Sequence, residues 1–228
     1  MSTIPLNDPA LGQAPARGRF ITLEGGEGAG KSTQVQRIIA HLKAKGLDAM
    51  ATREPGGSPG AEAMREVLLS GKIKPLGPGA EALAFYAARL DHIEKTIRPA
   101  LERGQWVICD RFSDSTRAYQ GANHQVDERL LKALDRVIVA DMKPDLTFIL
   151  DLPPEIGMAR ANARRGAQAT DRFEGEDLTF HHALRARFLE IAAQEPQRCF
   201  VVDATQSPDD VSAALCDLID LRLELGFA

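Results

Sequence analysis

The chain has 228 residues, 44% of them hydrophobic, and a formal net charge of −4. This size suits one compact domain with a full core, and the acidic balance without a long basic run argues against binding to nucleic acid. No apolar run approaches the ~20 residues of a membrane span and the N-terminus lacks the order of a signal peptide, so we expect a cytoplasmic protein that does not bind membranes.

The predicted elements begin after an N-terminal segment, residues 1–18, which contains three prolines and no hydrophobic period. We expect this segment to be a mobile tail and residues 19–228 to form a single domain. Short apolar runs in this domain predict strands, and longer segments of helical period predict helices. In chain order, the predicted strands are residues 20–23, 47–52, 106–109, 146–150 and 200–202. The predicted helices are residues 32–45, 81–103, 127–139, 154–164, 177–193 and 208–225.

The alternation of strands and helices predicts repeated βαβ units. Their crossovers are right-handed, so the five strands run parallel in one sheet that is buried on both faces. The fold class is therefore α/β, with three layers and helices on both faces of the sheet. Ligands of such sheets bind at the carboxyl ends of the strands.

A phosphate-binding loop follows the first predicted strand. Gly25, Gly30, Lys31 and Ser32 fit the pattern G-x-x-x-x-G-K-[ST] between a strand and a helix. In such loops the backbone N–H groups surround the β-phosphate, the lysine bridges the β- and γ-phosphates, and the hydroxyl binds Mg²⁺. The residues expected to bind ATP are Gly25, Gly26, Glu27, Gly28, Ala29, Gly30, Lys31, Ser32 and Thr33.

Other classes of P-loop protein lack support in the sequence. A GTPase needs N-K-x-D after a later strand, whereas residues 142–145 read MKPD. A motor ATPase usually ends an apolar strand in Asp-Glu, whereas the strand at 106–109 is followed by Asp110 and Arg111. A small-molecule kinase is the remaining class.

Five stretches stand in the order found in thymidylate kinases. They read GGEGAGKST at residues 25–33, TREPGG at 52–57, FYAAR at 85–89, DRFSDSTRAYQG at 110–121 and DRFE at 171–174. The chain resembles the bacterial type of this family over nearly the whole domain. The resemblance implies a P-loop nucleoside monophosphate kinase fold, transfer of a phosphoryl group from ATP with Mg²⁺ to dTMP for dTTP synthesis, and a homodimer packed through helices.

Two arginines directly follow predicted strands and suggest a second phosphate site. Arg53 and Arg111 would both project over the carboxyl edge of the sheet, where a guanidinium fork suits a phosphate. Surface ion pairs with Glu54 and Asp110 are the alternative. The resemblance implies that Arg111 holds the acceptor phosphate.

A base pocket is expected beside these arginines. Phe85 and Arg89 share one face of a helix, so the ring can stack on a base while the guanidinium donates to a base carbonyl; the alternative is that Phe85 belongs to the core. The resemblance implies that both contact thymine and that Tyr119 lies against the deoxyribose. It also implies that the pocket is lined by Ser115, Thr116, Tyr119 and Gln120.

Glu27 places a carboxylate in the middle of the phosphate loop. Because the loop turns its N–H groups inward, the Glu27 side chain must point outward, toward the acceptor. The resemblance implies that Glu27 approaches the 3′-hydroxyl of dTMP, and the alternative is that the position has no function.

The expected mechanism depends on positive charge. The acceptor phosphate has a second pKa of about 6 and needs no general base at pH 7. The P-loop has no Arg between its glycines, and residues 164–174, rich in Arg, resemble the lid of the bacterial enzymes. We expect Arg165 or Arg172 to reach the γ-phosphate, and Arg164 is a third candidate. Asp110 has two possible roles: it binds Mg²⁺, directly or through water, or it anchors an Arg.

Three other functions stay open. The first is a kinase for another pyrimidine monophosphate. The second is a nucleoside kinase, which would need a carboxylate base for a 5′-hydroxyl. The third is an inactive nucleotide-binding regulator, which the intact set of charged residues disfavours.

Overall fold

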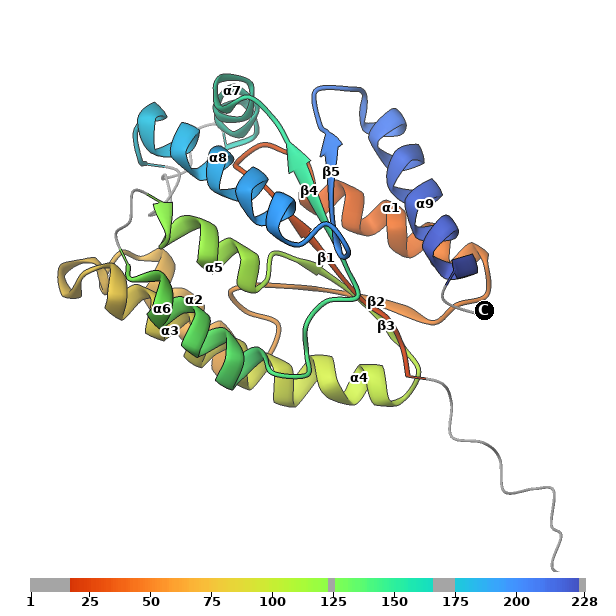
Figure 1. The fold of residues 1–228 in the computed structure, drawn as a ribbon, viewed down its shortest axis with the longest axis horizontal. Helices are drawn as coiled ribbons and strands as arrows, with labels where there is room; N and C mark the ends of the chain where they lie inside the picture. The colour runs from red at the N-terminus through yellow and green to blue at the C-terminus, as the bar shows by residue number, and fades with distance from the viewer. Residues whose placement is uncertain (1–16, 123–125, 166–174, 226–228) are drawn as a thin grey trace, which may run out of the picture.

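The computed structural model describes residues 17–122, 126–165 and 175–225. Its centre is a five-stranded parallel sheet, as predicted, and its strands lie in the order β2-β3-β1-β4-β5 (Figure 1). The strands are β1 (Phe20–Glu24), β2 (Ala49–Arg53), β3 (Trp106–Asp110), β4 (Leu146–Asp151) and β5 (Cys199–Asp203). Each predicted strand lies within two residues of its observed bounds.

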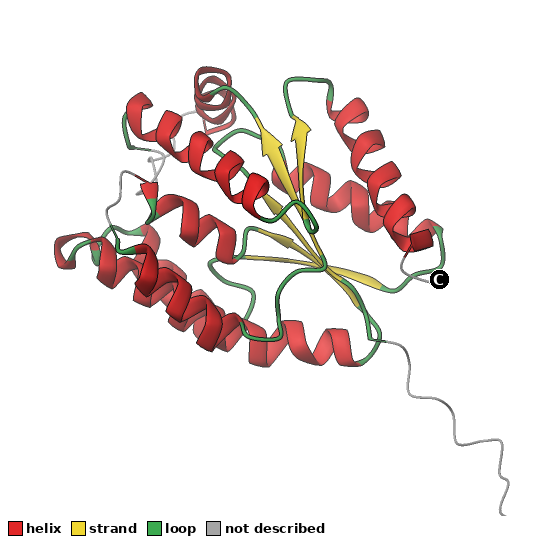
Figure 2. Ribbon diagram, viewed as in Figure 1, coloured by secondary structure: helices red, strands yellow, loops and turns green. Residues whose placement is uncertain are grey.

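Helices cover both faces of the sheet, which gives the three expected layers (Figure 2). On one face, α1 (Lys31–Ala44) and α9 (Pro208–Leu225) pack against each other. The other face is covered by α3 (Pro78–His92), α4 (Arg98–Glu102), α5 (Ser113–Tyr119), α6 (Glu128–Leu134) and α8 (Leu178–Gln194). The remaining helices are α2 (Pro59–Leu69), which packs against α3, and α7 (Pro154–Arg165), which packs against α8.

The central strand β1 is buried on both sides, as a parallel strand between two helix layers must be. Ile21 and Leu23 belong to the cluster that contains α1 and α9, whereas Phe20 belongs to the cluster under α3 and α4. All five residues of β1 are buried. The end of β1 is therefore held firmly where the phosphate loop begins.

Two predicted helices are interrupted by π-helical turns. The segment predicted at 81–103 consists of α3, the π-helical η2 (Ile93–Ile97) and α4. The segment predicted at 127–139 consists of α6 and the π-helical η4 (Asp135–Val139). Hydrophobic period does not distinguish a π-turn from a regular helix, so the sequence predicted one helix in each place.

Two helices near the cavity were not predicted. Helix α2 follows the Gly- and Pro-rich residues 55–58 and begins with Pro59 in its first turn. Only two residues separate helix α5 from the end of β3, and the helix has only seven residues. A short 3₁₀ turn, η1 (Lys74–Leu76), was also missed.

The predicted tail falls largely on residues 1–16, which lie outside the described residues. Gly18, which the sequence assigned to the tail, donates its N–H to Leu101 at 2.8 Å. Among the described helices, none is both long and apolar enough to cross a membrane.

Candidate active site

A cavity of about 280 Å³ opens at the carboxyl edge of the sheet, between the phosphate loop, α3 and α5. Most residues predicted to bind a ligand meet here. The predicted residues that line it are Glu27, Gly28, Ala29, Gly30, Lys31, Ser32, Thr33, Arg53, Phe85, Arg89, Asp110, Arg111, Ser115, Thr116, Tyr119, Gln120 and Arg164. Gly25 and Gly26 line a smaller cavity behind the loop.

The phosphate loop requires glycine where it touches α7. Gly28 has φ +68°, and a Cβ there would lie 2.1 Å from the carbonyl oxygen of Gly157 in α7. In return, a Cβ on Gly157 would lie 2.4 Å from the carbonyl oxygen of Glu27. Loop and helix therefore meet backbone to backbone, which only two glycines allow.

Lys31 and Ser32 occupy the positions expected for the triphosphate site. Lys31 is buried, and its Nζ donates to the carbonyl oxygens of Gly25 at 3.1 Å and Gly26 at 2.8 Å. Burial, followed by the charge of Arg111, lowers the pKa of Lys31 to about 8. A poorly solvated ammonium of this kind gains strongly from a polyphosphate.

Ser32 and Asp110 offer oxygen atoms that fit Mg²⁺. The Ser32 hydroxyl donates to Asp110 Oδ2 at 2.5 Å, from the start of α1 to the end of β3. Mg²⁺ prefers oxygen ligands and is usually bound by one or two carboxylates together with phosphates and water. The described residues contain no cluster of three or more His, Cys, Asp or Glu that could hold a metal on its own.

Arg111 points toward Glu27. Its Nη2 donates to Glu27 Oε1 at 2.6 Å, and its Nη1 donates to Gly25 O at 3.0 Å and to Ser115 Oγ at 3.2 Å. The Tyr119 hydroxyl also donates to Glu27 Oε1, at 2.7 Å. Burial alone would raise the pKa of Glu27, but Arg111, then Lys31 and the Tyr119 hydroxyl, outweigh it and lower this pKa to about 2. The Glu27 carboxylate thus lines the cavity and forms an ion pair with Arg111, and its approach to the acceptor stays a prediction.

Arg53 lies on the same edge but in a more open position. Its Nη2 donates to both oxygens of Glu62 in α2, at 2.9 and 3.1 Å. The ion pair is exposed, and it does not involve Glu54, the partner considered from the sequence. Because α2 was not predicted, the sequence offered no means of finding Glu62.

Glu54 is instead the buried centre of a second cluster. Its Oε2 accepts a hydrogen bond from Arg89 Nε at 2.8 Å, and its Oε1 lies 2.9 Å from His92 Nδ1. Arg89 is almost fully buried, and its Nη2 donates to Thr116 Oγ1 at 2.9 Å. Sequence reasoning missed the roles of Glu54 and His92; the spacing of Arg89 and His92 on one helical face was the available signal.

Two buried polar atoms of the cavity wall have no partner among the described residues. They are Nη1 of Arg89, a donor, and Oε1 of Gln120, an acceptor. Buried polar atoms are rarely left unsatisfied, so each has a physical reason to meet a ligand. Phe85 is half-buried beside them and packs at the margin of the cluster that contains α8.

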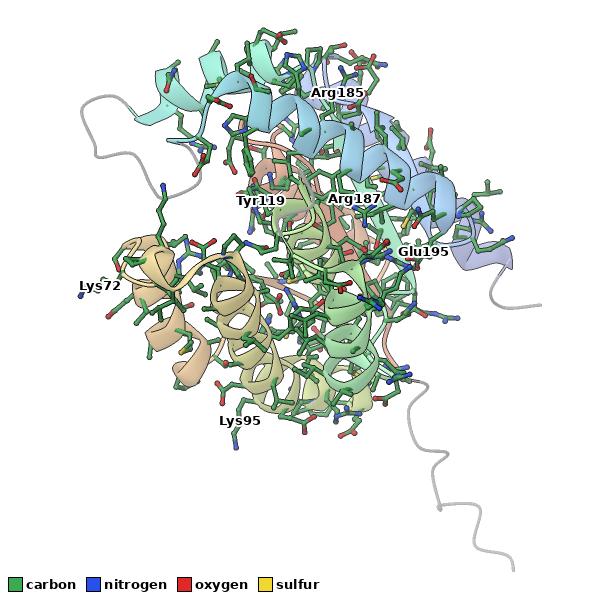
Figure 3. The ribbon with its side chains drawn as sticks, turned by 60° about the vertical axis from the view of Figure 1, so that its left-hand side comes forward. Lys72, Lys95, Tyr119, Arg185, Arg187 and Glu195 are labelled. Atoms are coloured by element: carbon green, nitrogen blue, oxygen red, sulfur yellow. The ribbon has the colours of Figure 1, made fainter. Side chains whose placement is uncertain are left out.

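Tyr119 lies at the end of α5 and faces α8 (Figure 3). Its ring centroid is 6.1 Å from that of Phe180 and 6.4 Å from that of Phe188. The guanidinium of Arg111 lies 5.1 Å from the centre of the same ring. These contacts fix Tyr119 in the position that hydrogen-bonds Glu27.

Only the beginning of the predicted lid, residues 164–174, lies within the described residues. Arg164 is exposed on α7 and lines the cavity. Arg165 ends α7, and its side chain lies outside the described part, as does Arg172. Which of these arginines reaches a phosphate stays a prediction.

The chain is similar to known proteins over most of its length. The family model described as "Thymidylate kinase" matches residues 23–215. The thymidylate kinase of Bradyrhizobium sp. (strain BTAi1) is 56% identical over 216 residues, which cover 95% of this chain and 96% of the relative. That of Nitrobacter hamburgensis is 58% identical over 199 residues, which cover 87% of this chain and 86% of the relative. The crystal structure of thymidylate kinase from Ehrlichia chaffeensis has a TM-score of 0.70 and 32% sequence identity, covering 89% of this chain and 99% of that one. With this cavity, this sheet order and these relatives, the chain belongs to the thymidylate kinase family.

Proposed function

We propose that the enzyme transfers the γ-phosphoryl group of ATP to dTMP, giving ADP and dTDP. The observation that carries the proposal is one cavity lined by the phosphate loop on one side and by Arg89, Arg111 and Gln120 on the other. Donor and acceptor can therefore lie end to end, with their phosphates meeting near Lys31 and Arg111.

On the donor side, the loop amides and Lys31 hold the β- and γ-phosphates. Ser32 and Asp110, which are hydrogen-bonded to each other, would hold Mg²⁺, and the ion would neutralise phosphate charge. Lys31 exchanges the carbonyl oxygens of Gly25 and Gly26 for phosphate oxygens. The lid arginines Arg164, Arg165 and Arg172 are candidates to cover the transferred group and exclude water.

On the acceptor side, Arg111 exchanges Glu27 for the phosphate of dTMP. A phosphate dianion competes well for a guanidinium because it accepts two charge-assisted hydrogen bonds. Glu27, still held by Tyr119, then accepts a hydrogen bond from the sugar 3′-hydroxyl. Arg53, at the open side of the cavity, adds a second cation.

The base is recognised by the two buried polar atoms of the cavity wall that have no partner among the described residues. Arg89 Nη1 donates to a carbonyl oxygen of thymine and Gln120 Oε1 accepts its ring N–H, while Phe85 stacks on the ring. Ser115 and Thr116 complete the wall. A cytosine ring presents an unprotonated nitrogen in place of that N–H, so Gln120 Oε1 would face another acceptor.

The test is an ADP-release assay with dTMP, dUMP, UMP and CMP at equal concentrations. We expect the highest kcat/KM with dTMP and the lowest with CMP, since the pocket is built for a ring N–H and Tyr119 crowds a ribose hydroxyl. A higher kcat/KM with UMP or CMP would assign the enzyme to another pyrimidine nucleotide.

We also propose that two copies form a homodimer through α3 and α6. Leu83 and Leu90 are 52% and 46% exposed on one face of α3, and Leu130 and Val137 are 39% and 72% exposed on α6 and η4. The α3 and η4 segments lie in contact. Two apolar pairs on adjacent helices form a patch suited to a second copy.

A further inference from the structure

Glu24, the last residue of β1, is a buried carboxylate directly behind the acceptor arginine. Its side chain has no exposed surface. Glu24 Oε1 accepts a hydrogen bond from the backbone N–H of Phe112 at 2.8 Å, and Oε2 accepts one from the Ser115 hydroxyl at 2.6 Å. None of the substrate contacts proposed above uses Glu24.

The segment that Glu24 binds is strained. Arg111 has φ +70°, a left-handed conformation that residues other than glycine rarely adopt and that persists only where surrounding contacts impose it. The N–H of Arg111 donates to Leu23 O at 3.0 Å, and the next N–H, that of Phe112, donates to Glu24. Two successive amides are therefore tied to the end of β1.

The side chain of Arg111 is tied to the same carboxylate through Ser115. Arg111 Nη1 donates to Ser115 Oγ at 3.2 Å, and Ser115 in turn donates to Glu24 Oε2. Glu24 thus fixes both the backbone turn and, through one hydroxyl, the direction of the guanidinium.

Keeping a carboxylate in this place is costly to the fold. Burial, followed by the nearby charge of Asp114, raises the pKa of Glu24 to about 7. A buried carboxylate whose ionised form is disfavoured does not improve packing, so its presence calls for another reason.

We propose that Glu24 is a positioning residue that holds Arg111 in its strained conformation and so sets the affinity for the monophosphate acceptor without touching either substrate. The inference rests on the proposed function, because it takes Arg111 as the ligand of the acceptor phosphate.

The test compares Glu24→Leu and Glu24→Gln with the control Thr22→Val. Leu fills the space without an acceptor, whereas Gln keeps an acceptor for Phe112 N–H. Thr22 lies two residues earlier on the same face of β1, is equally buried and pairs with Thr147 at 2.8 Å, and in the described part of the chain its hydroxyl makes no direct hydrogen bond to Arg111, Phe112 or Ser115. Steady-state kinetics with dTMP and with ATP are measured for each variant, and calorimetry gives the dissociation constant for dTMP.

We expect kcat/KM for dTMP to fall roughly ten- to a hundredfold in Glu24→Leu and about three- to tenfold in Glu24→Gln, with KM for ATP within about threefold of wild type. Calorimetry should give the same order for dTMP affinity, and Thr22→Val should leave it within about twofold. Loss of folded protein would lower the apparent kcat and leave the KM values for dTMP and ATP unchanged. A raised KM for dTMP that Gln partly restores therefore indicates positioning.

Unchanged dTMP affinity in folded Glu24→Leu, or equal losses for ATP and dTMP, would overturn the proposal. If Glu24→Leu does not fold, Glu24→Gln decides, and an unchanged KM for dTMP in that variant counts against the role. Failure of the wild-type enzyme to phosphorylate dTMP would instead overturn the proposed function, and it is seen before any variant is made.

Discussion

At the scale of single residues, the wall of the cavity on the dTMP side contains buried polar atoms that have no hydrogen-bond partner among the described residues. Gln120 Oε1 is buried, lines the cavity and has no partner among the described residues. Replacing Gln120 by Leu removes this acceptor at similar volume. We expect dTMP to bind roughly tenfold more weakly while the free energy of unfolding is unchanged or rises, because a buried unsatisfied atom is lost.

Calorimetry with dTMP and with an ATP analogue checks this prediction, since ATP affinity should not change. Equal dTMP affinity in wild type and Gln120→Leu would remove Gln120 from the base pocket. Loss of stability would show instead that the residue serves the fold.

The two glutamates of the loop region respond to pH in opposite directions. The pKa of Glu24 is raised to about 7, so its contribution to stability is present below its ordinary pKa of 4.5 and is lost as pH rises through 7. The pKa of Glu27 is lowered to about 2, so its contribution is present above pH 4.5 and is lost as pH falls toward 2.

Glu24→Gln should therefore change how stability depends on pH. Between pH 5 and pH 8 the wild type should lose about 2 kcal/mol relative to Glu24→Gln, because only the wild type must ionise a buried carboxyl. Urea unfolding at the two pH values measures the difference. Parallel stability profiles for the two proteins would mean that Glu24 titrates normally.

At the scale of elements, helix α5 carries much of the acceptor pocket and is anchored by a buried ion pair. Asp114 has no exposed surface, and it accepts hydrogen bonds from Arg117 at 2.8 Å and from Arg198 at 2.7 and 2.9 Å. Arg198 lies just before β5, so Asp114 ties α5 to the far edge of the sheet. The anchor fixes Ser115, Thr116 and Gln120 as a group.

Asp114→Asn should destabilise the protein and weaken dTMP binding together. Arg117 and Arg198 each lose one charged partner and keep Glu195, and repulsion of Glu24 is also relieved, so we expect a loss of about 1–3 kcal/mol in urea unfolding. The exposed pair of Asp141 with Arg98 provides the control, because Asp141→Asn should cost less than about 1 kcal/mol. Equal losses in both variants would contradict an anchoring role for Asp114.

The elements also explain what could be predicted from the sequence. The strands and the phosphate loop were predictable because apolar runs and the spacing of Gly25, Gly30 and Lys31 are local signals. Helices α2 and α5 were not, since one follows a Gly- and Pro-rich stretch and the other has seven residues. Glu54 and Arg89 are 35 residues apart in the sequence. No local pattern around either residue indicates that both are buried and paired with each other.

At the scale of the whole molecule, helix α3, which bears the exposed Leu83 and Leu90, lies on the side of the sheet away from α9 (Figure 1). If this face joins two copies, Leu90→Glu should convert a dimer of about 50 kDa, twice the 24.8 kDa chain, into a monomer. Leu221→Glu on α9, at a residue of similar exposure, should leave the mass unchanged. Light scattering after size-exclusion chromatography measures both, and a wild-type mass of one chain would refute the dimer.

The contact between Gly28 and Gly157 has a mechanical consequence. With no side chain between them, a tilt of α7 cannot be absorbed by a change of rotamer and must displace the backbone of residues 27–28. Helix α7 bears Arg164 at one end and abuts the carbonyl of Glu27 near the other. A residue larger than glycine at position 28 or 157 would therefore press on the neighbouring backbone and shift the phosphate loop.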